Sequence, residues 1–548
     1  MVPAAAALAT ACTPTEVVKF LNVVRAKKGL PPLPLPEATP PPPPLPASPP
    51  PAPPPAPGAT VAVSAEVAVN KLTFGARPGY VAAVKAMGVG AWIDQQLSPA
   101  GLPQADDRVP AASYPTLANS NLQNDAVANL PSGSDRIYAE MDHAFLQRAV
   151  YSERQLYEVM CDFWANHFNV WRRHTWMGFL RPRDHEDVVR ANALGKFSTM
   201  LSASAHSPSM LDYLDNLPND ASQPGGVNQN YARELLELHS LGIIAGVQVY
   251  TEADVQAVAQ IISGWALDWD DASATKYDFK FLPWQHSRTA VTAFGGAINV
   301  PARSYGEGYS DGVTLIDYLA HHPSTARYIC WKLCRRFIGD NPPMTLVDSA
   351  AAVFTANDTA IAPTLRHIFM SDEFAASGGT KVRRPLEHLV ACLRAVNATM
   401  STDPVGHSAV ALRSALDDMG QPLFERATPD GYPDIAPYWV SSDSLLNRWE
   451  VSARIARNTL GDQTVVADRV RVDLPTLLPN PLPATVGELV AALASTLANF
   501  TIPAADIADI CMAIALSASA AATTLSTSAT KLALAMGLIL SHPNFQRR

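Results

Sequence analysis

The sequence predicts an all-α fold: one large multi-helix globular domain with long ordered loops, preceded by a proline-rich linker. From about residue 62 onward, apolar residues recur at helical spacing almost throughout, and the alternating pattern typical of strands is nearly absent. Residues 31–57 contain seventeen prolines, which cannot build a core because proline lacks a backbone donor and holds the chain extended. We therefore predict four parts: an N-terminal segment with one amphipathic helix (1–30), the linker (31–58), a main helical domain (59–400) and a C-terminal helical part packed on it (401–548).

The helices are predicted from apolar stripes and from their first and last residues. In residues 15–29, Val17 and Phe20 lie on one face and Gly29 ends the pattern. Residues 151–169 carry the clearest stripe, with apolar side chains at positions i, i+3, i+4, i+7 and i+8 from Leu156 onward.

Two further helices are predicted by their N-terminal caps. Thr251 and Asp254 form a capping box at the start of residues 251–266. Pro323 occupies the first helical position that proline favours, which predicts a helix over residues 322–338. The remaining helices are expected at residues 136–150, 184–203, 313–321, 345–356, 359–370, 383–398, 443–459, 485–499 and 504–518.

Two segments lack a periodic pattern. Residues 268–312 are aromatic and rich in glycine, which fits either one small hairpin or a long ordered loop. Residues 420–440 form a second irregular segment, rich in proline and glycine. The uncharged run from Ile510 to Thr530 is long enough to cross a membrane, but its many Ser, Thr and Ala residues favour two short buried helices, so we predict no transmembrane segment.

The composition limits the partners and the compartment. The net charge of −9 includes no basic excess, so we expect no nucleic-acid partner. Charged residues are only 17% of the chain, and Ala, Ser, Thr and Pro take their place, which is common in exported proteins. The first twelve residues, MVPAAAALATAC, fit a trimmed export or lipoprotein signal. An extracytoplasmic location, periplasmic or at the cell surface, is therefore expected.

The six cysteines do not form a disulfide framework, because they are few and scattered along the chain. Cys330 and Cys334 are four residues apart on a predicted helix, a geometry that seldom suits a disulfide. We interpret them as small buried hydrophobic residues.

Candidate chemistry gathers in two helical segments and one turn. His167 lies on the apolar stripe of its helix, where it is either a core residue or a ligand. The segment from Asn230 to Gly242 carries Glu234 and His239, and Asp215 ends the preceding helix. These residues supply carboxylates and imidazoles, the groups used for general acid–base catalysis and for metal binding.

Helical geometry limits how these residues combine. Glu234 and His239 diverge by roughly 140° on a regular helix and cannot hold one ion together. A metal would need ligands from several helices, with His167, Asp215 and Glu234 as the candidates. The alternative is a structural lattice in which Arg233 pairs with Glu237 at i+4 and fixes the helix register.

Other well-known catalytic patterns are missing from the sequence. It contains no G-x-S-x-G elbow, phosphate-binding loop, dinucleotide fingerprint or paired C-x-x-C. The sequence therefore assigns no cofactor-binding residues, and whether the protein uses a cofactor stays open. Aromatic clusters around Trp164 and Trp265 indicate core packing, with a groove for carbohydrate or another polymer as the alternative.

An ordered series of motifs resembles a known family. The motifs are Lys71-Leu-Thr-Phe-Gly-Ala-Arg-Pro-Gly79, Ala91-Trp-Ile-Asp-Gln-Gln-Leu97, Phe163-Trp-Ala-Asn-His-Phe168, Met210-Leu-Asp-Tyr-Leu-Asp-Asn216, the segment from Asn230 to Gly242, Thr251-Glu-Ala-Asp-Val255 leading to Gly264-Trp265, His322-Pro-Ser-Thr-Ala326, Lys332-Leu-Cys-Arg-Arg-Phe337 and Leu540-Ser-His-Pro-Asn-Phe-Gln546. Over roughly residues 66–548 the chain is similar to the bacterial family called domain of unknown function 1800.

The resemblance implies an all-α, commonly exported protein without an assigned activity. It also implies a partner, since members are often encoded beside a family of sulfatase-like proteins. The chain departs from the family pattern at His286-Ser-Arg288, where only the His is kept, and at Tyr432, where Trp is usual.

Two functional classes follow. The first is a non-catalytic scaffold or assembly factor that acts with a partner protein. The alternative is an extracytoplasmic hydrolase, possibly dependent on a metal, whose acidic and histidine site uses His167, Asp215, Glu234 and His239. The enzyme hypothesis requires that these side chains meet around a cavity that solvent can reach.

Overall fold

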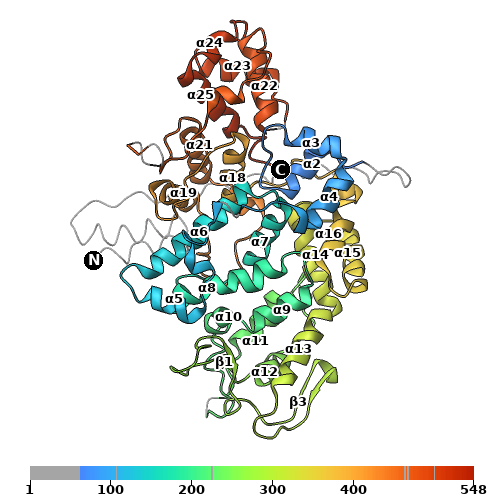
Figure 1. The fold of residues 1–548 in the computed structure, drawn as a ribbon. Helices are drawn as coiled ribbons and strands as arrows, with labels where there is room; N and C mark the ends of the chain where they lie inside the picture. The colour runs from blue at the N-terminus through green and yellow to red at the C-terminus, as the bar shows by residue number, and fades with distance from the viewer. Residues whose placement is uncertain (1–61, 106–107, 224–225, 462–463, 466–467, 499) are drawn as a thin grey trace, which may run out of the picture. The chain divides into compact units, whose positions relative to one another are not determined.

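The computed structural model describes residues 62–105, 108–223, 226–461, 464–465, 468–498 and 500–548, and these belong to one compact unit, Val61–Arg548. The predicted helix at 15–29 and the linker at 31–58 lie outside the described residues. The division of the domain at residue 400 stays a prediction. The described chain is predominantly helical, which confirms the predicted fold class (Figure 1).

Helices and short strands follow one another along the chain. The first half contains α2 (Ala65–Leu72), α3 (Tyr80–Met87), α4 (Val89–Leu97), α5 (Asn121–Ala128), α6 (Gly133–Tyr151), α7 (Gln155–His167), α8 (Met177–Arg183), the π-helical segment η4 (Asp184–Arg190), α9 (Phe197–Ala205), α10 (Pro208–Tyr213), α11 (Asn230–Glu234), the π-helical segment η5 (Leu235–His239) and α12 (Glu252–Ile261). The second half contains α13 (Tyr309–His321), α14 (Pro323–Phe337), α15 (Met344–Ala356), α16 (Ile361–Phe369), α17 (Asp372–Ala375), α18 (Pro385–Ala395), α19 (His407–Asp418), α20 (Ala436–Trp439), α21 (Ser442–Ala456), α22 (Val486–Ala498), α23 (Ala504–Ala513), α24 (Thr523–Ser526) and α25 (Ala529–Ser541).

The irregular segment before α13 holds two antiparallel strand pairs, where the sequence suggested at most one hairpin. In the first pair, β1 (Trp265–Leu267) lies beside β2 (Phe279–Phe281). In the second, β3 (Val291–Ala293) lies beside β4 (Ile298–Val300). Each strand has only three residues, so alternation is too short to register as a pattern.

Capping signals in the sequence located helix starts well. Thr251 and Asp254 form the predicted reciprocal capping box of α12, with Asp254 N donating to Thr251 Oγ1 at 3.2 Å. His322 caps α14, since its Nδ1 accepts from Ser324 N at 3.1 Å. The run from Ile510 contains the end of α23 and the short α24, as two short helices were expected, but most of their residues are exposed or half-buried.

Two local predictions are wrong. Residues 184–203 do not form one helix, because η4 ends at Arg190 and α9 starts only at Phe197. Arg233 does not pair with Glu237; its guanidinium binds the Glu252 carboxylate at 2.6 Å, at the start of α12. The partner of Arg233 therefore comes from α12, whereas the i+4 spacing had predicted a partner within the segment from Asn230 to Gly242.

The core is continuous through the unit and buries three whole tryptophans, Trp92, Trp164 and Trp265. Around it α14 packs on α15, α9 on α13 and α21 on α25 (Figure 1). Burial of such large apolar surfaces is the main source of stability in a helical domain of this size.

A charged cluster also lies inside the unit. Glu387, 2% exposed, forms ion pairs with Arg336, with Arg384 (3.6 Å) and with Arg548 (3.2 Å). Arg384 forms a further ion pair with Asp162. Burial of a guanidinium group is costly, and in this cluster the carboxylates of Glu387 and Asp162 offset that cost.

Gly242, at the end of the segment after η5, is expected to reject a side chain. Its φ is +67°, its amide donates to Leu236 O at 3.0 Å, and an added Cβ would lie 2.3 Å from the Tyr328 ring. Gly242→Ala should lower the free energy of unfolding by roughly 2–4 kcal/mol, through the left-handed backbone and the overlap with Tyr328.

Chemical denaturation of the two purified proteins measures this loss. Gly246→Ala is the matched control, because Gly246 also has a positive φ (+78°) but meets nothing within 4 Å. The control should cost only about 1–2 kcal/mol. Equal losses at both positions would contradict the role given to Tyr328.

Candidate functional site

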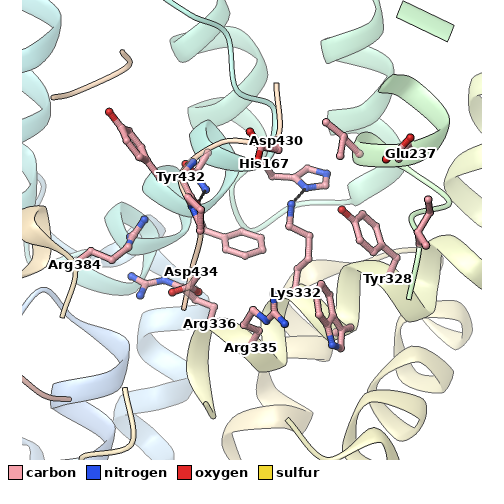
Figure 2. A pocket seen from close by; sticks show the side chains of 16 residues that line it. His167, Glu237, Tyr328, Lys332, Arg335, Arg336, Arg384, Asp430, Tyr432 and Asp434 are labelled. Carbon is pink, nitrogen blue, oxygen red and sulfur yellow. Dashed lines mark hydrogen bonds between the residues drawn. The ribbon is translucent and has the colours of Figure 1, made fainter. Parts of the chain in front are cut away.

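A cavity lined by many charged side chains lies between α7, η5, α14 and the loop at 430–434. It has a volume of about 270 Å³. Its walls are formed by Phe163, Asn166, His167, Glu237, Leu238, Ile243, Tyr328, Trp331, Lys332, Arg335, Arg336, Arg384, Asp430, Tyr432, Pro433 and Asp434 (Figure 2).

One face of α14 forms a large part of this wall. Tyr328, Trp331, Lys332 and Arg335 are spaced i, i+3, i+4 and i+7, which places them on a single side of the helix. The opposite side of α14 buries residues such as Leu333 in the core. The helix therefore carries an apolar stripe for packing and a polar stripe for the cavity.

Lys332 and His167 meet inside the cavity. Lys332 Nζ donates a hydrogen bond to His167 Nδ1 at 2.8 Å, and Figure 2 shows the lysine amine directed at the imidazole ring. His167 Nε2 lies 3.3 Å from the carbonyl oxygen of His239. Donation by Lys332 makes Nδ1 the acceptor, so the second contact assigns the proton of the neutral ring to Nε2.

Burial decides the protonation of both groups. It lowers the pKa of His167 well below its usual range, and the charge of Lys332 lowers it further. Burial also lowers the pKa of Lys332 to about 8. At neutral pH the pair is therefore a neutral imidazole beside an ammonium group that loses its proton with little cost.

Among the described residues, Lys332 and Arg335 are the cations of the wall that no close carboxylate holds; Asp430 and Asp434 act on the Lys332 charge only from a greater distance. Within the described part of the chain neither forms an ion pair: Lys332 binds His167, while Arg335 donates to Asp340 O at 3.1 Å and stacks 3.9 Å from the centre of the Trp331 ring. The other cations of the wall, Arg336 and Arg384, are held by the buried carboxylates beneath the cavity.

The acidic residues of the wall are mostly engaged elsewhere. Asp434 accepts an ion pair from Lys381 at 3.0 Å; burial raises its pKa, but the charges of Lys381, Arg336 and Arg384 outweigh this effect and lower it. Asp430 pairs with Arg426 at 3.4 Å. The cavity therefore presents Lys332 and Arg335 as its available cations.

Comparison with known proteins places the chain in a family. The model of a family described as a protein of unknown function (DUF1800) matches residues 67–547. The chain belongs to the DUF1800 family. Comparisons with curated proteins and with solved structures give no match. The resemblance found in the sequence is thereby confirmed, whereas the DUF1800 assignment leaves the activity undetermined.

Three of the DUF1800-like motifs quoted from the sequence converge on the cavity. Phe163–Phe168 provides His167, the segment from Asn230 to Gly242 provides Glu237, and Lys332–Phe337 provides Lys332 and Arg335. Residues from the motifs that identify the family thus form part of the wall of one cavity. Tyr432, where the sequence resemblance leads one to expect Trp, lines the same cavity.

The structure brings two of the four predicted site residues together. His239 is fully buried behind His167, with ring centres 6.2 Å apart, and burial lowers its pKa to about 3. Asp215 is exposed and accepts from Asn230 Nδ2 at 3.1 Å. Glu234 is half-buried and lines no part of the cavity, although burial raises its pKa.

The proposed metal ligands do not form a common site. Among the described residues no group of three His, Cys, Asp or Glu side chains is placed to hold a metal ion, and His167, Asp215 and Glu234 therefore do not converge. The five described cysteines are buried and unbridged, as expected for Cys330 and Cys334. In this part of the chain no helix has the length and apolar character needed to cross a bilayer.

Sequence reasoning missed Lys332, Arg335 and Tyr328, the central residues of the cavity. Arg335 lies in the last turn of α14, where the helix dipole favours cations and already accounts for a basic residue. The available signal was the i, i+3, i+4, i+7 spacing of Tyr328, Trp331, Lys332 and Arg335. This polar stripe lies on a helix whose other face is apolar, and it marks a cavity wall.

Proposed function

We propose that this DUF1800 protein binds an anionic ligand in the cavity between α7 and α14. The observation that supports the proposal is the Lys332 ammonium group, fixed by His167 at 2.8 Å in a cavity where it has no carboxylate partner. A buried cation without a counterion is costly, and a bound anion removes that cost.

The wall favours a carboxylate, sulfate or phosphate group. Arg335 and Lys332 lie one helical turn apart and together provide charged donors to oxygen atoms, while Tyr328 and Trp331 offer aromatic surface for the rest of the ligand. A volume of about 270 Å³ suits the anionic end of a ligand better than a whole large molecule.

Hydrolysis of an ester of such an anion is the chemical extension of this proposal: water attacks the acyl, phosphorus or sulfur centre, the ester bond breaks, and the leaving oxygen takes up a proton. Below its pKa Lys332 donates that proton, above it the free amine takes a proton from the attacking water, and the neutral His167 orients the amine. In this form of the hydrolase hypothesis, Lys332 transfers the protons and His167 positions it, in place of the predicted set of His167, Asp215, Glu234 and His239. A scaffold function is supported by a different surface, an apolar groove of about 750 Å³ between α21, α23 and α25.

The pH dependence of anion binding tests the proposal. Sulfate, phosphate and acetate would be titrated into the protein by calorimetry, with chloride salts holding the ionic strength constant. Because the pKa of Lys332 lies at about 8, the ammonium group is present at neutral pH and lost above the pKa. Affinity for the preferred anion should fall about tenfold between pH 7 and roughly pH 9.5.

Arg335 stays charged over this range, so the fall reports on Lys332. The bound anion favours the ammonium form, which should shift the midpoint of the fall above pH 8. An affinity that does not change with pH, or the lack of binding by all three anions at neutral pH, would contradict the proposal.

Two further proposals rest on the family resemblance and on composition. We propose an extracytoplasmic location, which cell fractionation of the native producer tests. We also propose a sulfatase-like partner protein and no nucleic-acid partner, the latter because the net charge of −9 offers no general attraction to phosphate backbones.

A further inference from the structure

The two π-helical segments of the described chain each line a cavity. η5 contributes Glu237 and Leu238 to the anion cavity. η4 contributes Asp184, Asp187 and Val188 to a second cavity of about 570 Å³, which shares no wall residue with the first. π-Helical turns are rare overall but frequent at functional sites, so η4 marks the second cavity as a candidate binding site.

The second cavity is surrounded by amide, hydroxyl and carboxylate groups from several elements. The start of α5 brings Asn121 and Gln123, β2 and the residue before it bring Phe279 and Asp278, and the start of α10 is preceded by Ser207. Its volume lies inside the range of small-molecule sites, which is about 300–1,000 Å³.

The charges of this wall are nearly balanced. Asp184 pairs with the buried Arg181 and accepts from Ser207 Oγ at 2.6 Å, and Asp187 pairs with Arg183. Asp278 is bound only by an amide, Asn121 Nδ2, at 3.0 Å. The wall therefore repels anions, and the described residues offer no metal-binding group of three.

One hydrogen-bond acceptor remains available in the wall. Asp278 is only partly buried, and its Oδ1 accepts from Asn121 Nδ2, which leaves Oδ2 for a further donor. Burial raises the pKa of this carboxyl. The Oδ1 atom of Asn121 has no partner among the described residues, but it is closed off from solvent and takes no part in the site.

One side of the cavity offers apolar and aromatic surface. Phe279 meets the His206 ring edge-on at 4.5 Å between ring centres, and His206 in turn stacks on Trp265 at 4.4 Å. Both His206 nitrogens are already bonded, to Ser202 O and Tyr309 Oη, which fixes the ring as part of the wall.

We propose that this second cavity binds a saccharide. A sugar ring presents hydroxyl donors for Asp278 and an apolar C–H face for Phe279. It has no net charge, which suits a wall that repels anions and in which Asp184 and Asp187 are already paired. The proposal stands apart from the anion cavity, since neither site supplies a residue to the other.

Saturation-transfer NMR with cellotriose, chitotriose and maltotriose at millimolar concentration tests the proposal on the full-length protein. At least one trisaccharide should receive signal from the wild type. Asp278→Asn, which removes an acceptor without changing shape, should weaken binding about tenfold, the loss expected for one hydrogen bond to a charged group. Ala203→Phe, which fills the cavity from α9, should abolish binding.

Asp271→Asn is the matched control, because this carboxylate lies between the same two strands but is 91% exposed and pairs with Lys276. It should bind like the wild type, and so should Lys332→Met, which alters only the anion cavity. Thermal unfolding of each variant verifies folding. The proposal would be overturned if no trisaccharide gave a signal. It would also be overturned if Asp278→Asn and Ala203→Phe bound with the affinity of the wild type, or if Lys332→Met lost binding.

Discussion

Lys332→Met should weaken binding of the preferred anion roughly a hundredfold, which corresponds to about 3 kcal/mol for a charged hydrogen bond in a partly desolvated site. Methionine has a similar length and keeps the contact of the side chain with the Tyr328 ring one turn earlier on α14, so the change removes charge more than volume. Calorimetric titration of variant and wild type at neutral pH gives the ratio directly.

The same variant should fold as well as the wild type. Burial of the Lys332 amine opposes its charged state, so its removal relieves a cost and leaves only His167 Nδ1 without its donor. Lys85→Met is the matched control, since Lys85 is exposed at the surface and pairs with Glu66. If both variants bind the anion equally, Lys332 does not form the site.

Glu387→Gln should be the most destabilising conservative substitution in the domain, with a loss of about 3–5 kcal/mol of unfolding free energy. The substitution keeps the shape of the side chain but removes the charge that holds Arg336, Arg384 and Arg548. These guanidinium groups then stay buried with Asp162 as their remaining ion-pair partner and Asp434 acting on Arg384 and Arg336 from a greater distance. Urea denaturation measures the loss.

The pH dependence of stability provides a second check on Glu387. Burial raises its pKa, but Arg336 and Arg384 outweigh this effect and lower it below the unfolded value of 4.5. Its contribution is therefore complete above about pH 4.5 and is lost as the pH falls through the folded pKa. The wild type should lose this stability in acid, and Glu387→Gln should lose less.

Asp94→Ala serves as the control for the ion pair itself. Asp94 pairs with Arg366 at 2.7 Å on the surface, and its removal should change the unfolding free energy by less than about 1 kcal/mol. Similar effects at Glu387 and Asp94 would contradict a special role for the buried cluster.

Features set by neighbouring residues could be predicted from the sequence, whereas contacts between residues far apart in the chain could not. The starts of α12 and α14 were predicted because the capping atoms lie within three residues of the helix. His167 was identified because a histidine on an apolar stripe is visible in one helix. Lys332 was not, because its partner lies 165 residues away in the sequence.

The ion-pair lattice shows the same limit. It was predicted within the segment from Asn230 to Gly242, where i+4 spacing suggests it. The structure instead connects Arg233 to the start of α12 and places the dense charged cluster around Glu387. The spacing of residues in one helix shows which ion pairs are possible, but the packing of neighbouring helices determines which of these pairs form.

The π-helical segments η4 and η5 also change how substitutions along these helices should be interpreted. A π turn acts as a single-residue insertion, and it rotates everything after it by about 100° relative to everything before it. Tyr231, before the π turn, lies in the core, and Glu237, inside η5, lines the cavity, so the core and cavity positions follow two separate phases. Because the two phases are independent, the helix can change its cavity-facing residues without disturbing the register of its core stripe.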